Sequence, residues 1–289
     1  MKKDYYQIGF NFLNNSKFHR AITYLTKAIE EDPTHAWAYE RRGMAYYYLC
    51  QLPEAIENFT SALSLDATLT SALYNRASIY LTREETEKAA SDTETLLALD
   101  PNNTDYRYLG LRVFPAVKKY RKALLIVNDL LKANPENVDL IWTKGWIFAS
   151  LENPQEAIIW YKKGLQIDHT NVMLMNNIGF EATKAGNFSL AEEYFERALR
   201  LSPEEPYPLN NYGYLEHLRG NNGRAHKLIN QSLENDCSNS FAYKNMGIVL
   251  LAIGQREKAF EHLQMALELG YTQDYDEEVN QLLSKHFPE

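Results

Sequence analysis

The chain has 289 residues, of which 45% are apolar and 24% are charged, so its composition is that of a folded protein and excludes a disordered one. Its formal net charge is −8, and this charge is unevenly distributed. Residues 1–136 contain 17 basic and 17 acidic side chains, whereas residues 137–289 contain 13 basic and 21 acidic ones. Since neither half is basic, the sequence lacks the electrostatic footprint of a nucleic-acid-binding protein.

The N-terminal segment shows no export signal. Its first residues are charged, and polar residues such as Asn11 and Asn14 interrupt the segment that follows them. No apolar stretch reaches the roughly 20 residues that a membrane-spanning helix needs. The two cysteines, Cys50 and Cys237, are too far apart along the chain for a disulfide between them to be expected. Two lone thiols fit a reducing compartment, so we predict a cytoplasmic protein that does not bind membranes.

One period of 34 residues covers the chain from residue 2 to residue 273 without insertion or deletion, and residues 1–273 are therefore predicted to form a repeat region. The eight windows are 2–35, 36–69, 70–103, 104–137, 138–171, 172–205, 206–239 and 240–273. Position 20 is always alanine: Ala21, Ala55, Ala89, Ala123, Ala157, Ala191, Ala225 and Ala259. Position 8 is small in seven windows: Gly9, Gly43, Ala77, Gly145, Gly179, Gly213 and Gly247. Small residues at these positions let two helices approach closely, so each window predicts a packed helix pair.

The boundaries of the two helices are also visible in each window. Polar or glycine-rich breaks fall at positions 15–17, as at Gly186-Asn187, and predict the turn between the helices. Proline at position 32 ends the second helix in four windows, because the residue before proline disfavours the helical region: Pro33, Pro101, Pro135 and Pro203. One helix pair cannot bury its apolar face alone, so we expect the stack to share a continuous core.

The fourth window departs from this pattern. Leu111 replaces the small residue at position 8, and Pro115 lies inside the first helix. A proline in a helix interior removes a hydrogen bond and kinks the helix. Two interpretations remain open at this point: a bend between repeats 1–3 and repeats 5–8, or a tolerated irregularity with one local kink.

Residues 274–289 fall outside the period and predict a C-terminal capping helix. Tyr275, Val279, Leu282 and Leu283 recur at helical spacing, and the acidic residues near Asp274 suit the start of a helix. This helix is expected to cover the last repeat.

The period and the small residues at positions 8 and 20 resemble the tetratricopeptide repeat family, and the resemblance covers about 94% of the chain. It implies an all-α fold: a right-handed α-solenoid superhelix of eight helix pairs plus the C-terminal capping helix. It also implies that the first helices line the concave surface, and that the protein binds another protein or a peptide as a scaffold or adaptor.

No chemistry that would suggest an enzyme is visible in the sequence. The seven histidines form neither an HExxH pair nor a zinc-like cluster with cysteine, and no glycine-rich phosphate loop occurs. We therefore predict no catalytic residues, no metal site and no cofactor.

In the resembling family, positions 2, 5, 6, 9, 12 and 13 of the first helices face the groove, and in repeats 5–8 most side chains at positions 2, 5, 6 and 9 are aromatic or amide. The predicted groove residues are Trp142, Trp146, Asn176, Asn177, Phe180, Tyr207, Asn210, Asn211, Tyr214, Lys244 and Asn245. An asparagine can donate to a backbone carbonyl and accept from a backbone N–H at once. Some members of the family hold peptide backbone with an asparagine row of this kind, which Asn177, Asn211 and Asn245 resemble. The alternative is that the amides bridge neighbouring repeats and that the aromatic rings pack between repeats.

The pattern favours some functions of this family over others. The carboxylate clamp for chaperone C-termini needs lysine and asparagine at the positions of Tyr6 and Phe10, and asparagine at the position of Arg41. It also needs lysine and arginine at the positions of Ser71 and Asn75, so this mode is disfavoured. The leading hypothesis is a protein or peptide partner held as an extended segment in the groove. A self-assembling protein that uses its terminal repeats, through residues such as Tyr5, Ile8 and Phe12, is the alternative. RNA binding is opposed by the 34-residue period and the acidic balance.

Overall fold

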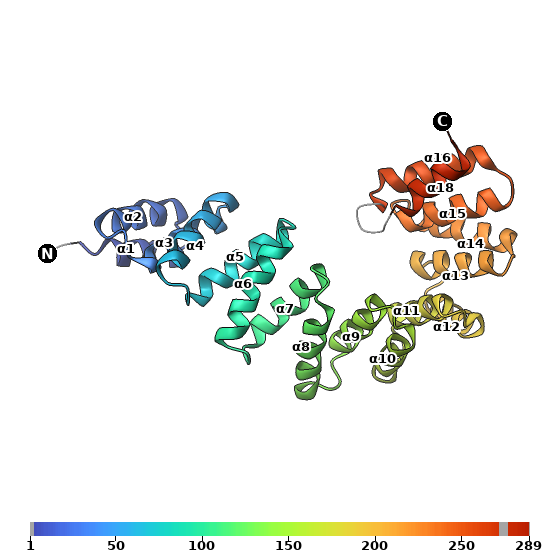
Figure 1. Cartoon of the computed structure of the whole chain (residues 1–289), viewed down its shortest axis with the longest axis horizontal. Helices are drawn as coiled ribbons and strands as arrows, with labels where there is room; N and C mark the ends of the chain where they lie inside the picture. Colours follow the sequence, from blue (N-terminus) through green and yellow to red (C-terminus); the bar gives the residue numbers. More distant parts are fainter. Residues whose placement is uncertain (1–2, 272–276, 289) are drawn as a thin grey trace. The chain divides into compact units, whose positions relative to one another are not determined.

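The protein is built from α-helices, and helices that follow one another in the chain run antiparallel. A computed structural model describes residues 3–271 and 277–288, and this part of the chain contains seventeen helices and no strand (Figure 1). The first eight helices are α1 (Tyr5–Asn14), α2 (Phe18–Glu31), α3 (Ala36–Tyr48), α4 (Leu52–Leu65), α5 (Thr70–Thr82), α6 (Thr86–Leu99), α7 (Thr104–Ala116) and α8 (Tyr120–Ala133). The others are α9 (Val138–Ser150), α10 (Pro154–Ile167), α11 (Val172–Lys184), α12 (Phe188–Leu201), α13 (Pro206–Leu218), α14 (Asn222–Asn235), α15 (Ser240–Ala252), α16 (Arg256–Glu268) and α18 (Glu278–His286). The predicted all-α helical-repeat solenoid is confirmed.

The chain divides into two compact units, residues 1–127 and residues 128–289, with the division inside α8. Helices α1–α7 belong to the first unit, and α9–α18 belong to the second. The division falls in the irregular fourth repeat. The interpretation of Pro115 as a bend stays a prediction.

The helices follow the 34-residue period closely. From the second window on, each first helix begins at the first residue of its window and has 13 residues. Position 15, directly after the first helix, has a positive φ in every repeat. Glycine occupies it in the last three repeats, and other residues occupy it in the first five: Ser16, Cys50, Glu84, Lys118 and Glu152. A left-handed residue here reverses the chain after the first helix, which explains the polar and glycine-rich breaks in the sequence.

Contact between positions 8 and 24 holds each helix pair together. A Cβ added to Gly179 would lie 2.5 Å from a ring carbon of Phe195, and one added to Gly145 would lie 2.5 Å from Tyr161. The position-20 alanines are fully buried in all eight repeats, as predicted: Ala21, Ala55, Ala89, Ala123, Ala157, Ala191, Ala225 and Ala259. Glycine and alanine are therefore required here because the aromatic or aliphatic partner occupies the space that a larger residue would need.

The fourth repeat keeps this contact by shifting it one residue. Gly110, at position 7, faces Ile126, whose Cδ1 would lie 2.8 Å from an added Cβ, and the two residues keep the spacing of 16 seen in the other repeats. Leu111, where a small residue was expected, is buried instead. Helix α7 continues through Pro115 and ends one residue later. Pro115 has no N–H to donate to the backbone carbonyl of Leu111, and because only Ala116 follows it in the helix, the disturbance is limited to the C-terminal end of α7.

Half-buried arginines link successive repeats in the first unit. Arg76 donates two hydrogen bonds to Asp92, at 2.8 and 2.7 Å, and one to Thr60 of the preceding repeat at 3.0 Å. Arg42 repeats the arrangement with Asn58 and Thr26. These charge-assisted contacts tie each first helix to the second helices on both sides of it.

The C-terminal helix α18 packs on the last repeat. Val279 is fully buried among Leu263, Ala266 and Tyr271, and Leu282 and Leu283 pack against this cluster. Tyr275 and Asp274, which contributed to the prediction of a capping helix, lie outside the described residues.

Candidate functional site

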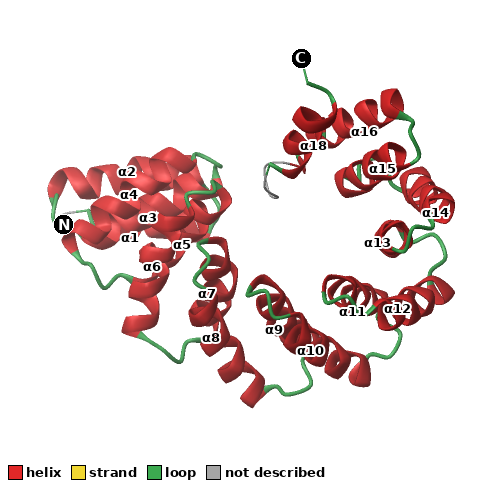
Figure 2. Ribbon diagram, turned by 45° about the vertical axis from the view of Figure 1, so that its right-hand side comes forward, coloured by secondary structure: helices red, strands yellow, loops and turns green. Residues whose placement is uncertain are grey.

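The first helices of the second unit share one face. Figure 2 shows α9, α11 and α13 along the inner side of this unit, with α10, α12 and α14 outside them. A cavity of about 520 Å³ opens on the inner side. Its lining comes from α9, α10, α11, α13 and α15: Trp142, Trp146, Ala149, Ser150, Tyr161, Asn176, Asn177, Phe180, Glu181, Lys184, Tyr207, Asn210, Asn211 and Phe241. Eight of the eleven predicted groove residues therefore meet in one concave site.

Aromatic rings form the walls of this cavity and are unusually exposed. Trp142 and Trp146 stack one helical turn apart, with ring centroids 6.4 Å apart and an interplanar angle of 12°. Trp146, Phe180 and Tyr207 lie on three successive first helices and are 37%, 43% and 51% exposed. Large apolar side chains that gather in a concave site and remain accessible are typical of a binding surface.

The asparagines form a continuous chain of hydrogen bonds across three repeats. Asn245 donates to Asn210 at 2.9 Å, and Asn211 donates to Asn176 at 2.9 Å. Contacts of 3.4 Å within two of the repeats, from Asn210 to Asn211 and from Asn176 to Asn177, complete the chain. The amides thus bridge neighbouring repeats, which was the alternative interpretation of this row. Four of them also line the cavity, so bridging and lining are combined in the same side chains.

Three predicted groove residues lie outside the cavity lining. Lys244 is 8% exposed, and its Nζ lies 3.3 Å from Glu278 of α18 and 5.3 Å from the ring centroid of Tyr214. Burial lowers the pKa of the Lys244 ammonium, and Glu278 opposes that shift. Asn245 is buried, and its side-chain amide donates a hydrogen bond to Asn210. Glu278 of the C-terminal helix is thus the partner of Lys244, a pairing that was not predicted.

Polar groups at the base of the cavity lack ordinary partners. Glu181 is 3% exposed, and among the described residues no donor lies within hydrogen-bond distance of its Oε2. Its nearest cation is Lys184 Nζ, at 3.6 Å. The buried Nε1–H of Trp142 likewise finds no acceptor in the described part of the chain. Burial raises the pKa of the Glu181 carboxyl, and Lys184 partly opposes that shift. Burial and the neighbouring Glu181 also raise the pKa of the Tyr161 hydroxyl.

The raised pKa of Glu181 predicts a pH-dependent cost to stability. The folded state holds this proton to higher pH than the unfolded state, so ionisation of Glu181 destabilises the fold as pH rises. The effect begins near pH 4, where a free glutamate ionises, and is complete above the raised pKa. The stability of Glu181→Gln relative to wild type should therefore increase between pH 4 and pH 7 in urea denaturation. Glu193→Gln, at an exposed carboxylate of α12, is the control and should change stability by less than about 0.5 kcal/mol throughout. A pH-independent difference for Glu181→Gln would contradict the assignment.

Glu181 and Tyr161 were not predicted as site residues. Tyr161 lies on a second helix and fills the core position opposite Gly145, which gave no reason to place it in a groove. Glu181 did leave a signal in the sequence. It occupies position 10, which is apolar in six of the other seven repeats: Ala45, Ile79, Val113, Ile147, Leu215 and Val249.

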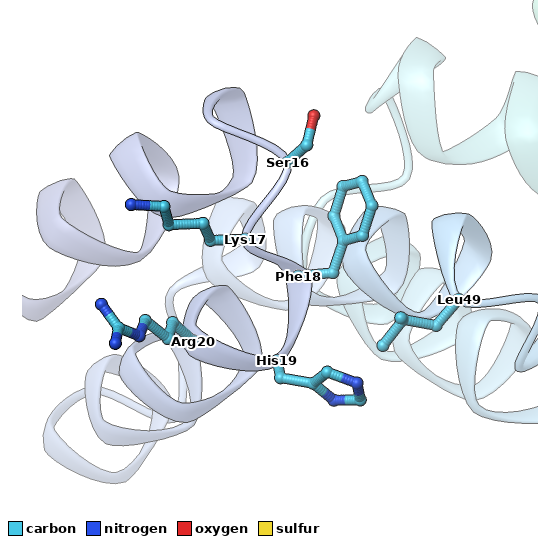
Figure 3. Close-up of a pocket in the computed structure, with 6 residues that line it drawn as sticks. All are labelled: Ser16, Lys17, Phe18, His19, Arg20 and Leu49. Carbon is cyan, nitrogen blue, oxygen red and sulfur yellow. The ribbon is translucent and has the colours of Figure 1, made fainter.

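Two other surfaces are weaker candidates. The N-terminal residues that support self-assembly are half-buried: Phe12 stacks on Tyr24 at 5.3 Å, and Tyr5 lies 6.3 Å from the same ring. Figure 3 shows a depression of about 380 Å³ at the first turn, where Lys17 and Arg20 point away from Phe18 and Leu49. Because its polar groups do not converge, this depression is an open surface feature.

Sequence models of the tetratricopeptide repeat match residues 6–69, 116–171 and 181–240, and a second model of the same repeat matches residues 70–103. The chain belongs to the tetratricopeptide repeat family. This fold is generally a non-catalytic scaffold for protein–protein interactions. No curated protein matches the chain.

Solved structures show the same tetratricopeptide fold at low sequence identity. PilW, a widely conserved type IV pilus biogenesis factor, is 21% identical with a TM-score of 0.57, over 75% of this chain and 99% of PilW. The C-terminal part of a repeat protein from Cytophaga hutchinsonii has a TM-score of 0.60 at 15% identity, over 83% of this chain and 99% of that one. The Cut9–Hcn1 hetero-tetramer of the APC/C gives a TM-score of 0.59 at 15% identity, over 93% of this chain and 52% of the matched chain. These similarities concern the fold alone.

None of the described helices is both long and apolar enough to span a membrane. Within the same residues, no group of three or more histidine, cysteine or acidic side chains is placed to hold a metal ion.

Proposed function

We propose that this protein is a non-catalytic scaffold that holds an extended segment of a protein partner across the first helices α9, α11, α13 and α15. The observation that carries the proposal is the set of exposed rings of Trp146, Phe180 and Tyr207 in one concave cavity. Rigid aromatic side chains in a concave site provide contact area at little entropic cost and are typical hot spots of protein interfaces. The neighbouring amides offer hydrogen bonds to the backbone of a bound segment.

The charges on this surface favour a protein segment that is not acidic. Both lysines at the groove positions of the second unit face carboxylates: Lys184 lies beside Glu181, and Lys244 lies beside Glu278. A C-terminal carboxylate would therefore have to compete with these glutamates for either lysine. The acidic balance of residues 137–289 also opposes nucleic acid and anionic membranes as partners.

Removing the exposed rings should weaken peptide binding and leave the fold intact. We expect peptides selected on the full chain from a displayed random library to lose tenfold or more in affinity with Trp146→Ala and with Tyr207→Ala, since each loss of about 1.4 kcal/mol or more is a hot-spot effect. The matched control is Trp37→Ala, an exposed tryptophan of the first unit. Affinities would be measured by fluorescence anisotropy and melting temperatures by circular dichroism. Selected peptides that bind both groove variants as tightly as wild type would place the partner surface elsewhere.

A further inference from the structure

Glu181 breaks the core pattern of its own repeat. The equivalent position in six other repeats holds an apolar side chain that is at most 1% exposed. Burying a carboxylate where the fold normally buries a hydrocarbon is costly unless the charge is well paired. A carboxylate buried at this position needs a cation or a hydrogen-bond donor, which either the protein or a ligand must provide.

Glu216 shows what an internally satisfied carboxylate looks like in this protein. It also occupies a position that is apolar in the other repeats, and it is fully buried. Asn221 donates to it at 2.9 Å, and the guanidinium groups of Arg219 and Arg224 lie 3.4 and 3.6 Å away. Glu181 has no such set, because Lys184 lies beyond hydrogen-bond distance and its side chain is 44% exposed. Glu181 therefore lines the cavity with a desolvated carboxylate whose Oε2 has no hydrogen-bond donor among the described residues.

The walls beside Glu181 suit a flat cation. The Trp142 and Trp146 rings and the Phe180 ring line the same cavity, and aromatic faces attract cations through the ring quadrupole. Lys184 illustrates the attraction: its Nζ lies 5.8 Å from the Phe180 ring centroid as well as 3.6 Å from Glu181. Lys184 therefore lies where a cation would contact both Glu181 and Phe180, but it makes no hydrogen bond to Glu181.

We propose that this cavity binds an arginine side chain of the partner segment, with its guanidinium at Glu181 and its plane against the aromatic walls. The proposal rests on the proposed function, because it names the residue that the groove selects. An arginine provides five donors in a planar fork that can satisfy a carboxylate with two hydrogen bonds, and the same plane stacks on aromatic rings. The Nε1–H of Trp142, which has no acceptor among the described residues, and the side-chain N–H groups of Asn177, for which the described residues likewise provide no acceptor, would then donate to backbone carbonyls beside the arginine.

Other occupants fit this site less well. A lysine is a compact, strongly hydrated charge that neither forks to a carboxylate nor stacks. An acidic side chain would be repelled by Glu181 and by the excess of acidic residues in 137–289. An apolar side chain would fill the walls but leave the carboxylate desolvated and unpaired.

The test uses capped seven-residue alanine–glycine peptides that differ only at the central residue: arginine, lysine, citrulline, leucine or glutamate. Citrulline has the shape of arginine without its charge. The full chain would be titrated while the four tryptophan indole N–H signals are followed by NMR. Trp142 and Trp146 report on the cavity, and Trp37 and Trp160 serve as internal controls outside its lining. We expect shifts at the two cavity signals, and an arginine peptide that binds about tenfold more tightly than the citrulline peptide, because its hydrogen bonds are charge-assisted.

Two variants separate this mechanism from others. Glu181→Gln should reduce the preference for arginine over citrulline below about twofold. Lys184→Ala should strengthen arginine binding about two- to fivefold, because it removes the half-exposed cation that competes for Glu181. An anion site built on Lys184 would instead lose affinity. If the peptides bind but arginine is not preferred, or if Glu181→Gln keeps the preference, the arginine site is overturned while the groove stands. If no peptide moves the Trp142 and Trp146 signals, the proposed function fails together with the inference.

Discussion

Replacing Phe195 by alanine is expected to lower the free energy of unfolding by about 3–5 kcal/mol, the usual loss for a large aromatic side chain in a tightly packed core. Phe195 is fully buried, faces Gly179 of its own repeat, and stacks with Tyr212 of the next repeat at 5.8 Å. It therefore joins the two helices of one pair and links that pair to the following one. Urea denaturation followed by circular dichroism would measure the loss.

The partner of Phe195 in this contact gives the matching test. Gly179→Ala should cost about 1–3 kcal/mol, since the new Cβ would lie 2.5 Å from the ring and the core resists overpacking. Gly223→Ala, on helix α14, is the control: nothing lies within 4 Å of its added Cβ, so this change should be neutral or slightly stabilising. In the double variant, the added methyl group occupies part of the space left by the ring. The double variant should therefore lose less stability than the sum of the two single losses. Full additivity would contradict the proposed contact.

The repeats could be predicted from the sequence because each helix pair obeys the same local constraints. Small residues at positions 8 and 20 are needed wherever two helices touch, and the turn at position 15 needs a left-handed residue, so the period is visible in every window. The fourth repeat was harder to interpret. A small residue one position earlier, at Gly110, takes over the contact, and a fixed window cannot detect such a shift.

The site could be predicted only in part, because it depends on side chains that meet across repeats. The exposed rings follow from the direction in which the first helices face. The pairing of Lys244 with Glu278 does not, because it depends on how the C-terminal helix packs against the last repeat. Glu181 was recognisable as a polar residue at an apolar position, but so was Glu216. Only the structure shows that arginines and an asparagine satisfy Glu216, whereas Glu181 faces the cavity.

Alanine substitutions at different positions of the asparagine chain should affect the stability of the fold and peptide binding to different degrees. Asn210 is 1% exposed, accepts from Asn245 and donates to Asn211. Asn210→Ala would therefore remove the partner of the buried Asn245 and of the half-buried Asn211, and we expect a loss of about 2–4 kcal/mol in the free energy of unfolding. Asn177 ends the chain, is half-buried, and accepts only the 3.4 Å contact from Asn176. Asn177→Ala should cost less than about 1 kcal/mol.

For peptide binding we expect the opposite order, with the larger effect from Asn177→Ala. The Oδ1 atom of Asn177 is oriented by Asn176, so its N–H groups remain available to the backbone of a bound segment at the edge of the cavity. Asn177→Ala should weaken peptide binding by about 0.5–1.5 kcal/mol, the contribution of a neutral hydrogen bond, at an unchanged melting temperature. Isothermal titration with selected peptides and thermal unfolding on the same samples would show both effects. Equal losses of stability for the two variants would mean that the amides act only as bridges between repeats. In that case the exposed rings and Glu181, and not the asparagine row, would have to hold the partner.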